Sequence, residues 1–95
     1  MVTAIISYQL KNFSDFKKGF DQDAAHRSSF GLHVKKLYQS TEDPNKVSVL
    51  LEAQDPESVK RFVASPDLKK AMEQYGIIAA PEVKILNEVR ILTEA

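Results

Sequence analysis

The sequence lacks cysteine and tryptophan, and only two of its 95 residues are histidines. Without thiols the chain can form no disulfide, no thiolate nucleophile and no cysteine-ligated iron–sulfur cluster. His26 and His33 are too few for a histidine-rich metal site, so we expect neither a metal nor a cofactor. A chain this short has a thin core, and a partner subunit is then the remaining way to bury more surface.

The sequence also lacks an excess of one charge and any long apolar run. Its 13 basic and 13 acidic residues are interspersed, whereas nucleic-acid-binding proteins usually carry a basic stripe. No apolar run is long enough to span a bilayer, and the first residues lack the basic start and apolar core of a signal peptide. We therefore expect a cytoplasmic protein with neither nucleic acid nor membrane as a partner.

Strand and helix patterns alternate along the chain. Apolar residues at period two predict four strands, at residues 2–10, 32–40, 46–53 and 82–92. The last strand follows an apolar, extended connector. A strand pattern interrupted in this way by helical segments is typical of an α+β domain.

Helices are predicted between these strands. An apolar stripe begins at Phe13 and a first helix ends at Gly31. Asp55-Pro56 and Ser65-Pro66 are both helix starts, so the second helical segment breaks in two before Gly76 ends it. The order is that of a ferredoxin-like βαββαβ fold, one domain over residues 1–95, with all helices on one face of a four-stranded antiparallel sheet.

The two faces of the predicted sheet differ in composition. One face is apolar throughout and must pack against the helices; its residues are Val2, Ala4, Ile6, Val34, Val47, Val49, Leu51, Val83, Ile85 and Val89. The other face is polar except for one apolar residue near the middle of each strand. A polar-rimmed apolar patch is typical of an interface, although scattered apolar surface residues are also common. We predict a homodimer interface formed by Ile5, Leu37, Leu50 and Leu86.

Four polar residues are predicted between the sheet and the helices, where a ligand pocket could lie. Two are on the first helix and two are on strands. Arg27 continues the apolar stripe of the first helix, and Asp23 lies one turn earlier and can pair with it. A guanidinium binds carboxylates and stacks on aromatic rings, and the phenols of Tyr8 and Tyr38 could hydrogen-bond a substrate. The alternatives are an arginine that reaches to water and core tyrosines with their tips at the rim.

Two residues are candidates for catalysis. His26 is one residue off the helix stripe and should flank the pocket or face solvent; it would serve as a base near neutral pH. Tyr38 is the other candidate. A surface histidine is the alternative reading, and His33 falls on the opposite face of the sheet, so the two histidines should not share a metal.

Several turns and helix starts carry a family resemblance. They are Tyr38, Asp43-Pro44-Asn45-Lys46-Val47 leading into Val49-Leu50-Leu51-Glu52, Asp55-Pro56-Glu57, and Ser65-Pro66-Asp67-Leu68 through Met72 to Gly76-Ile77. With these motifs the chain resembles the dimeric α–β barrel superfamily, which includes the antibiotic-biosynthesis monooxygenases. The resemblance implies a homodimer packed sheet to sheet, with a small pocket between sheet and helices in each subunit.

The resemblance leaves the activity open, because a fold does not determine a function. Superfamily members include cofactor-independent oxygenases, haem-degrading enzymes, isomerases and proteins of no known activity. The sequence favours a homodimer that binds a small hydrophobic or aromatic molecule. The alternative is a cofactor-independent monooxygenase or isomerase that positions its substrate and removes a proton. Haem binding through His26 is disfavoured, because the family's haem degraders typically use an Asn, Trp and His set and this chain has no tryptophan.

Overall fold

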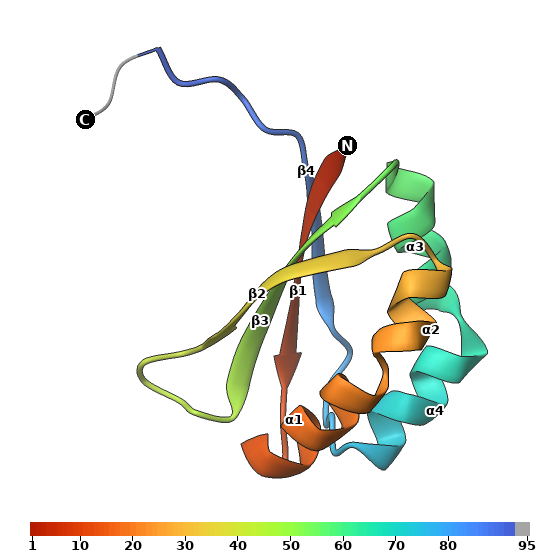
Figure 1. Ribbon diagram of the computed structural model, residues 1–95. Helices are drawn as coiled ribbons and strands as arrows, with labels where there is room; N and C mark the ends of the chain where they lie inside the picture. The colour runs from red at the N-terminus through yellow and green to blue at the C-terminus, as the bar shows by residue number, and fades with distance from the viewer. Residues whose placement is uncertain (93–95) are drawn as a thin grey trace.

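A four-stranded antiparallel sheet organises the structure, a computed structural model that describes residues 1–92. The elements along the chain are β1 (Val2–Gln9), α1 (Phe13–Gln22), α2 (Ala24–Ser29), β2 (His33–Gln39), β3 (Lys46–Ala53), α3 (Pro56–Ala64), α4 (Pro66–Gln74) and β4 (Glu82–Leu86). The strand order is β2-β3-β1-β4, and the helices lie on one side of the sheet (Figure 1). The predicted α+β, ferredoxin-like fold is confirmed.

Side-chain caps begin three of the four helices. Asn12 accepts a hydrogen bond from the Asp15 N–H at 2.8 Å, and this cap begins α1. Asp55 caps α3 and Ser65 caps α4, each with proline in the first turn, as predicted. The first helical segment differs from the prediction because it breaks at Asp23 into α1 and α2. Asp23 thereby lies at a junction between helices.

The sheet has an inner face, covered by the helices, and an outer face. On β1 and β3 the strict alternation of buried and half-buried residues confirms the predicted inner-face pattern. The core consists of these inner-face side chains together with apolar residues of the helices, and its largest fully buried members are Phe62, Ile6, Leu10, Leu51, Val47, Val49 and Val59. No helix within residues 1–92 is both long and apolar enough to cross a membrane.

A β-bulge in β2 reverses part of the predicted alternation. Val34 lies opposite Leu51, but the register shifts before Lys36, which lies opposite Leu50. The extra residue moves every later side chain to the other face. Leu37 and Tyr38, which follow the bulge, were therefore predicted on the wrong faces of the sheet.

Leu37 pairs with Val49 on the inner face and packs against the core. Tyr38 pairs with Ser48 on the outer face and is 50% exposed. Tyr38 therefore lies on the opposite side of the sheet from any pocket beneath the helices.

The last strand is shorter than predicted. Its pairing with β1 ends at Leu86 opposite Thr3, where β1 has almost reached its first residue. Residues 87–92 have no strand partner and lead away from the sheet (Figure 1). Val89, predicted in the core, is 79% exposed. The predicted strand over residues 82–92 was wrong beyond residue 86, because an apolar alternation forms a strand only where a neighbouring strand can supply hydrogen bonds.

Candidate functional site

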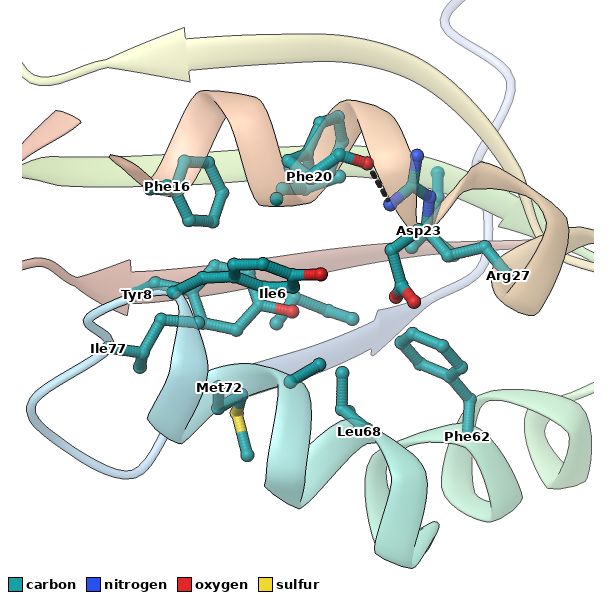
Figure 2. Close-up of a pocket in the computed structure, with 15 residues that line it drawn as sticks. Ile6, Tyr8, Phe16, Phe20, Asp23, Arg27, Phe62, Leu68, Met72 and Ile77 are labelled. Carbon is teal, nitrogen blue, oxygen red and sulfur yellow. Dashed lines mark hydrogen bonds between the residues drawn. The ribbon is translucent and has the colours of Figure 1, made fainter. Parts of the chain in front are cut away.

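A small cavity lies between the inner face of the sheet and the helices. It encloses about 30 Å³ and is walled mainly by apolar side chains of β1, β3, α1, α3 and α4. The lining residues are Ile6, Tyr8, Phe16, Gly19, Phe20, Asp23, Arg27, Val49, Leu51, Phe62, Leu68, Ala71, Met72, Tyr75 and Ile77. Figure 2 shows Asp23 and Arg27 at one end of this cavity and Phe16 toward the other. An apolar cavity with a few polar groups at one end is the usual form of a small-molecule site.

Arg27 is the cationic residue of the cavity wall. Its side chain continues the stripe of the first helical segment, as predicted, and the residue is 9% exposed. One guanidinium nitrogen, Nη1, donates to the carbonyl oxygen of Phe20 at 2.8 Å, and Cζ lies 4.0 Å from the centre of the Phe20 ring. Burial lowers the pKa of Arg27, and the nearby Asp23 and Tyr8 act in the opposite direction. Arginine nevertheless keeps its charge at neutral pH.

The Arg27 charge has no direct ion pair within residues 1–92. The predicted partner, Asp23, lies on the same cavity wall, but its carboxylate contacts His26 instead, with 3.3 Å between an Oδ atom and Nδ1. Asp23 is the N-cap of α2, and its carboxylate lies against His26, three residues later, rather than against Arg27, four residues later. Arg27 is thus nearly buried, with one backbone hydrogen bond and an aromatic ring in contact, and with Asp23 and Tyr8 nearby but not ion-paired with it.

His26 lies behind the cavity wall rather than on it. Its ring packs edge-on against Phe30 and tilted against Phe62, with 5.3 Å between ring centres in both pairs. The Nε2 atom is buried and has no hydrogen-bond partner among the described residues. The prediction that His26 flanks the pocket is consistent with this position. His26 contacts Asp23, and Asp23 in turn lines the cavity.

Tyr8 extends from β1 into the cavity. It is 7% exposed, and its ring centre lies 5.7 Å from that of Phe16. Burial raises the pKa of the Tyr8 phenol to about 12, although the Arg27 charge acts in the opposite direction. The phenol therefore stays protonated at neutral pH, where it can donate a hydrogen bond but cannot act as a base.

The structure brings three of the four predicted ligand-binding residues together. Tyr8, Asp23 and Arg27 all line the cavity, whereas Tyr38 does not. Tyr75 is not among the predicted site residues, yet it forms part of the cavity wall. The available signal was Gly19, because an isolated glycine in a helical pattern often has a packing reason. No group of three or more residues suited to hold a metal occurs within residues 1–92.

The outer face carries three of the four predicted interface residues. Ile5 pairs with Leu50 across β1 and β3, and Leu86 follows on β4. Leu37 lies on the other side of the sheet, and the half-exposed ring of Tyr38 lies on the outer face instead. The outer face thus has an apolar patch formed by Ile5, Leu50, Leu86 and Tyr38.

Solved structures share this fold over nearly the whole chain. A proposed antibiotic biosynthesis monooxygenase from Bordetella bronchiseptica has a TM-score of 0.77 and 20% identity, with 94% of this chain and 97% of that chain covered. SnoaB, a cofactor-independent oxygenase from Streptomyces nogalater, has a TM-score of 0.69 and 15% identity, with 98% and 97% covered. A proposed antibiotic biosynthesis monooxygenase from Caulobacter crescentus has a TM-score of 0.68 and 21% identity, with 94% and 90% covered.

These likenesses identify a class by its fold. The chain has the ferredoxin-like fold of antibiotic biosynthesis monooxygenase-like proteins, as the sequence resemblance predicted. Neither the protein-family models nor the curated proteins compared with the chain match it. At these identities the shared property is architecture, and activity has to be argued from the cavity itself.

Proposed function

We propose that this protein binds a small, flat aromatic or hydrophobic molecule with an acidic group, in the cavity between sheet and helices, and that it does so as a homodimer. The observation that carries the ligand proposal is the Arg27 guanidinium, nearly buried and without an ion pair among the described residues. A buried charge is costly unless it is paired and hydrogen-bonded. A carboxylate or phenolate on the ligand would supply the missing partner.

The rest of the cavity wall suits the remainder of such a ligand. Phe16, Phe20 and Phe62 present aromatic surface, and Ile6 and Leu68 present aliphatic surface. Flat rings pack well against such walls, and the protonated Tyr8 phenol can donate a further hydrogen bond to an oxygen of the ligand. The site therefore favours an apolar body with its acidic end toward Arg27.

Salicylate and salicylamide test this proposal, because they have the same shape and only the first is an anion. Arg27→Gln should weaken salicylate binding by about tenfold or more, since a charge-assisted hydrogen bond is worth about 1.5–3 kcal/mol, and should change salicylamide binding little. Arg27→Lys keeps the charge and should retain part of the preference. Ligand fluorescence gives the affinities, and circular dichroism checks that each variant is folded. Equal loss for both ligands, or no binding of either by the wild-type protein, would contradict the proposal.

The proposed dimer buries the apolar patch of Ile5, Leu50, Leu86 and Tyr38 against the same patch of a second copy. No helix of residues 1–92 covers this face (Figure 1). Each strand contributes one residue to the patch: Ile5 and Leu50 pair directly, and Leu86 and Tyr38 lie nearer the strand ends. A short chain with a thin core gains the most from such burial. The exposed apolar side chains of Val89, Ile91 and Leu92 lead away from the sheet edge and would be available to the same partner.

Charge at the centre of the patch tests the dimer. Leu50→Glu should yield a monomer in analytical ultracentrifugation, because two buried carboxylates would face each other across the two-fold axis. Lys69→Glu on the exposed side of α4 is the control and should leave the mass unchanged. A wild-type protein that sediments as a monomer at every concentration would overturn this part of the proposal.

Asp23 favours a second function, a cofactor-independent monooxygenase or isomerase. It is the carboxylate on the cavity wall, next to Arg27 and backed by His26. A carboxylate so placed could remove a proton from a carbon-acid substrate, and Arg27 would stabilise the resulting anion. The likeness of fold to SnoaB, a cofactor-independent oxygenase, makes this reading worth testing. Oxygen uptake with anthrone that Asp23→Asn abolishes would support it; no uptake by the wild-type protein would count against it.

A further inference from the structure

Gly19 in α1 makes room for the aromatic ring of Tyr75 at the end of α4. Gly19 is buried, and a Cβ added to it would overlap the ring atoms of Tyr75. The ring therefore lies directly against the backbone of α1, where any other residue would displace it. Tyr75 itself is the C-cap of α4 and is half-buried.

This contact lies between the cavity and a groove on the surface. Gly19 and Tyr75 line the cavity on one side, and both also line a groove on the outside between α1 and α4. The other groove residues are polar and exposed: Asp15, Lys18, Gln22 and Gln74. The ring of Tyr75 on Gly19 is thus part of a thin partition between an apolar interior and a solvated groove.

The cavity is too small for the ligand that its walls suit. It encloses about 30 Å³, whereas a cavity that binds benzene measures about 150 Å³. We propose that Tyr75 is a gate: its ring swings off Gly19 into the outer groove, which enlarges the cavity and opens a path by which a flat aromatic molecule enters between α1 and α4. The proposal deepens the ligand-binding function above and rests on it for the identity of the ligand.

Another wall could also open, at Met72 and Ile77, which line both the cavity and a groove on the far side of α4. The Gly19 side is favoured for two reasons. Tyr75 ends its helix, so its side chain can turn without disturbing further helical turns, and the groove beside it offers open space for the ring. Met72 lies within α4. Met72→Ala therefore serves as the competing variant in the test.

The absence of cysteine allows a test that needs no ligand. Val49→Cys places a thiol on the inner wall of the cavity, at a residue that is 2% exposed, and Cys is close to Val in size. Val59→Cys places a thiol in the core of α3, at a residue that does not line the cavity. The rate of modification by methyl methanethiosulfonate, followed by mass spectrometry, then reports how often each position becomes accessible.

Removal of the Tyr75 ring should make the cavity accessible to the reagent but leave the rest of the core inaccessible. In the Val49→Cys protein, Tyr75→Ala should raise the labelling rate by about tenfold or more, while Tyr75→Phe, which keeps a ring on Gly19, should leave the rate unchanged. Gly19→Ala should also raise it, because the added methyl displaces the ring. In the Val59→Cys protein none of these changes should matter. If Gly19→Ala does not fold, the double change with Tyr75→Ala removes the overlap and keeps the test valid.

Three results would overturn the gate. Labelling of the Val49→Cys thiol could be unaffected by Tyr75→Ala; it could rise only with Met72→Ala; or the Val59→Cys thiol could become reactive to the same extent, which would indicate general loosening. Failure of the ligand proposal is seen separately, as an absence of salicylate binding in every variant. If salicylate binds, Tyr75→Ala should raise its association rate in stopped-flow fluorescence, and an unchanged rate would contradict the gate as an access route.

Discussion

The two faces of the sheet are made from the same strands but meet different surroundings. Leu50 and Leu51 are neighbours on β3, and Leu51 is covered by the protein's own helices while Leu50 points to the uncovered side. The inner face also encloses the cavity, with its buried cation and phenol. Apolar residues of the inner face therefore stabilise the fold of the chain itself, whereas those of the outer face would be buried only in the proposed dimer.

The largest expected effect separates these two uses. Leu51→Ala should lower the free energy of unfolding by about 2–5 kcal/mol, because it removes a fully buried side chain and leaves a cavity. Leu50→Ala should lower the free energy of unfolding by less. The size of this loss should depend on protein concentration, because association of two copies stabilises the folded state by mass action. Urea unfolding at several concentrations measures both. If both variants lost the same free energy of unfolding at every protein concentration, Leu50 would be part of the subunit core like Leu51, and the proposed difference between the two faces would be wrong.

The second effect concerns the buried phenol of the inner face. The pKa of Tyr8 is raised from 10.0 to about 12 in the folded protein, so the folded state keeps its proton where the unfolded state has lost it. The contribution of Tyr8 to the free energy of unfolding is therefore fully present below about pH 10. It decreases by about 2–3 kcal/mol as the pH rises through about 12. Urea unfolding at rising pH measures this loss. Tyr8→Phe should flatten this part of the profile, and an unchanged slope in that variant would contradict the assignment.

The smallest effect tests which residues of β2 belong to which face. In the Leu50→Glu background, which removes the proposed dimer, Leu37→Ala should lower the free energy of unfolding by about 1–2 kcal/mol, because Leu37 packs against the core. Tyr38→Ala should cost less than about 1 kcal/mol, because its ring is half-exposed. Thermal unfolding compares the two variants. The reverse order would mean that the β-bulge is absent in solution.

The predictable parts of the fold depended on local signals. The capping residues Asp55 and Ser65, each followed by proline, begin α3 and α4 where the sequence indicates. Two-residue periodicity located β1 and β3 because both strands are regular and pair along their whole length. Arg27 was found on the cavity side because its position on the helix stripe survives the break at Asp23.

The wrong predictions concern residues whose position depends on a segment distant in the sequence. Val34 and Leu37 are three residues apart, and both can face the core only if the strand carries a bulge; pairing with β3 imposes that bulge. The apolar alternation beyond Leu86 looks like a strand, but β1 ends before it can pair. Asp23 was assigned to Arg27 by helical spacing, but as the N-cap of α2 it has both His26 and Arg27 within one turn, and its carboxylate lies against His26.

The sequence itself determined the α+β order of strands and helices and which residues of β1 and β3 face the helices. Local periodicity and capping suffice for that, because they act between residues close in the chain. Tertiary structure alone decided which side of the sheet Leu37 and Tyr38 occupy, turned the Asp23 carboxylate toward His26 rather than Arg27, and placed Tyr75 on Gly19. These outcomes depend on register and on contacts between separate elements, which no local pattern specifies.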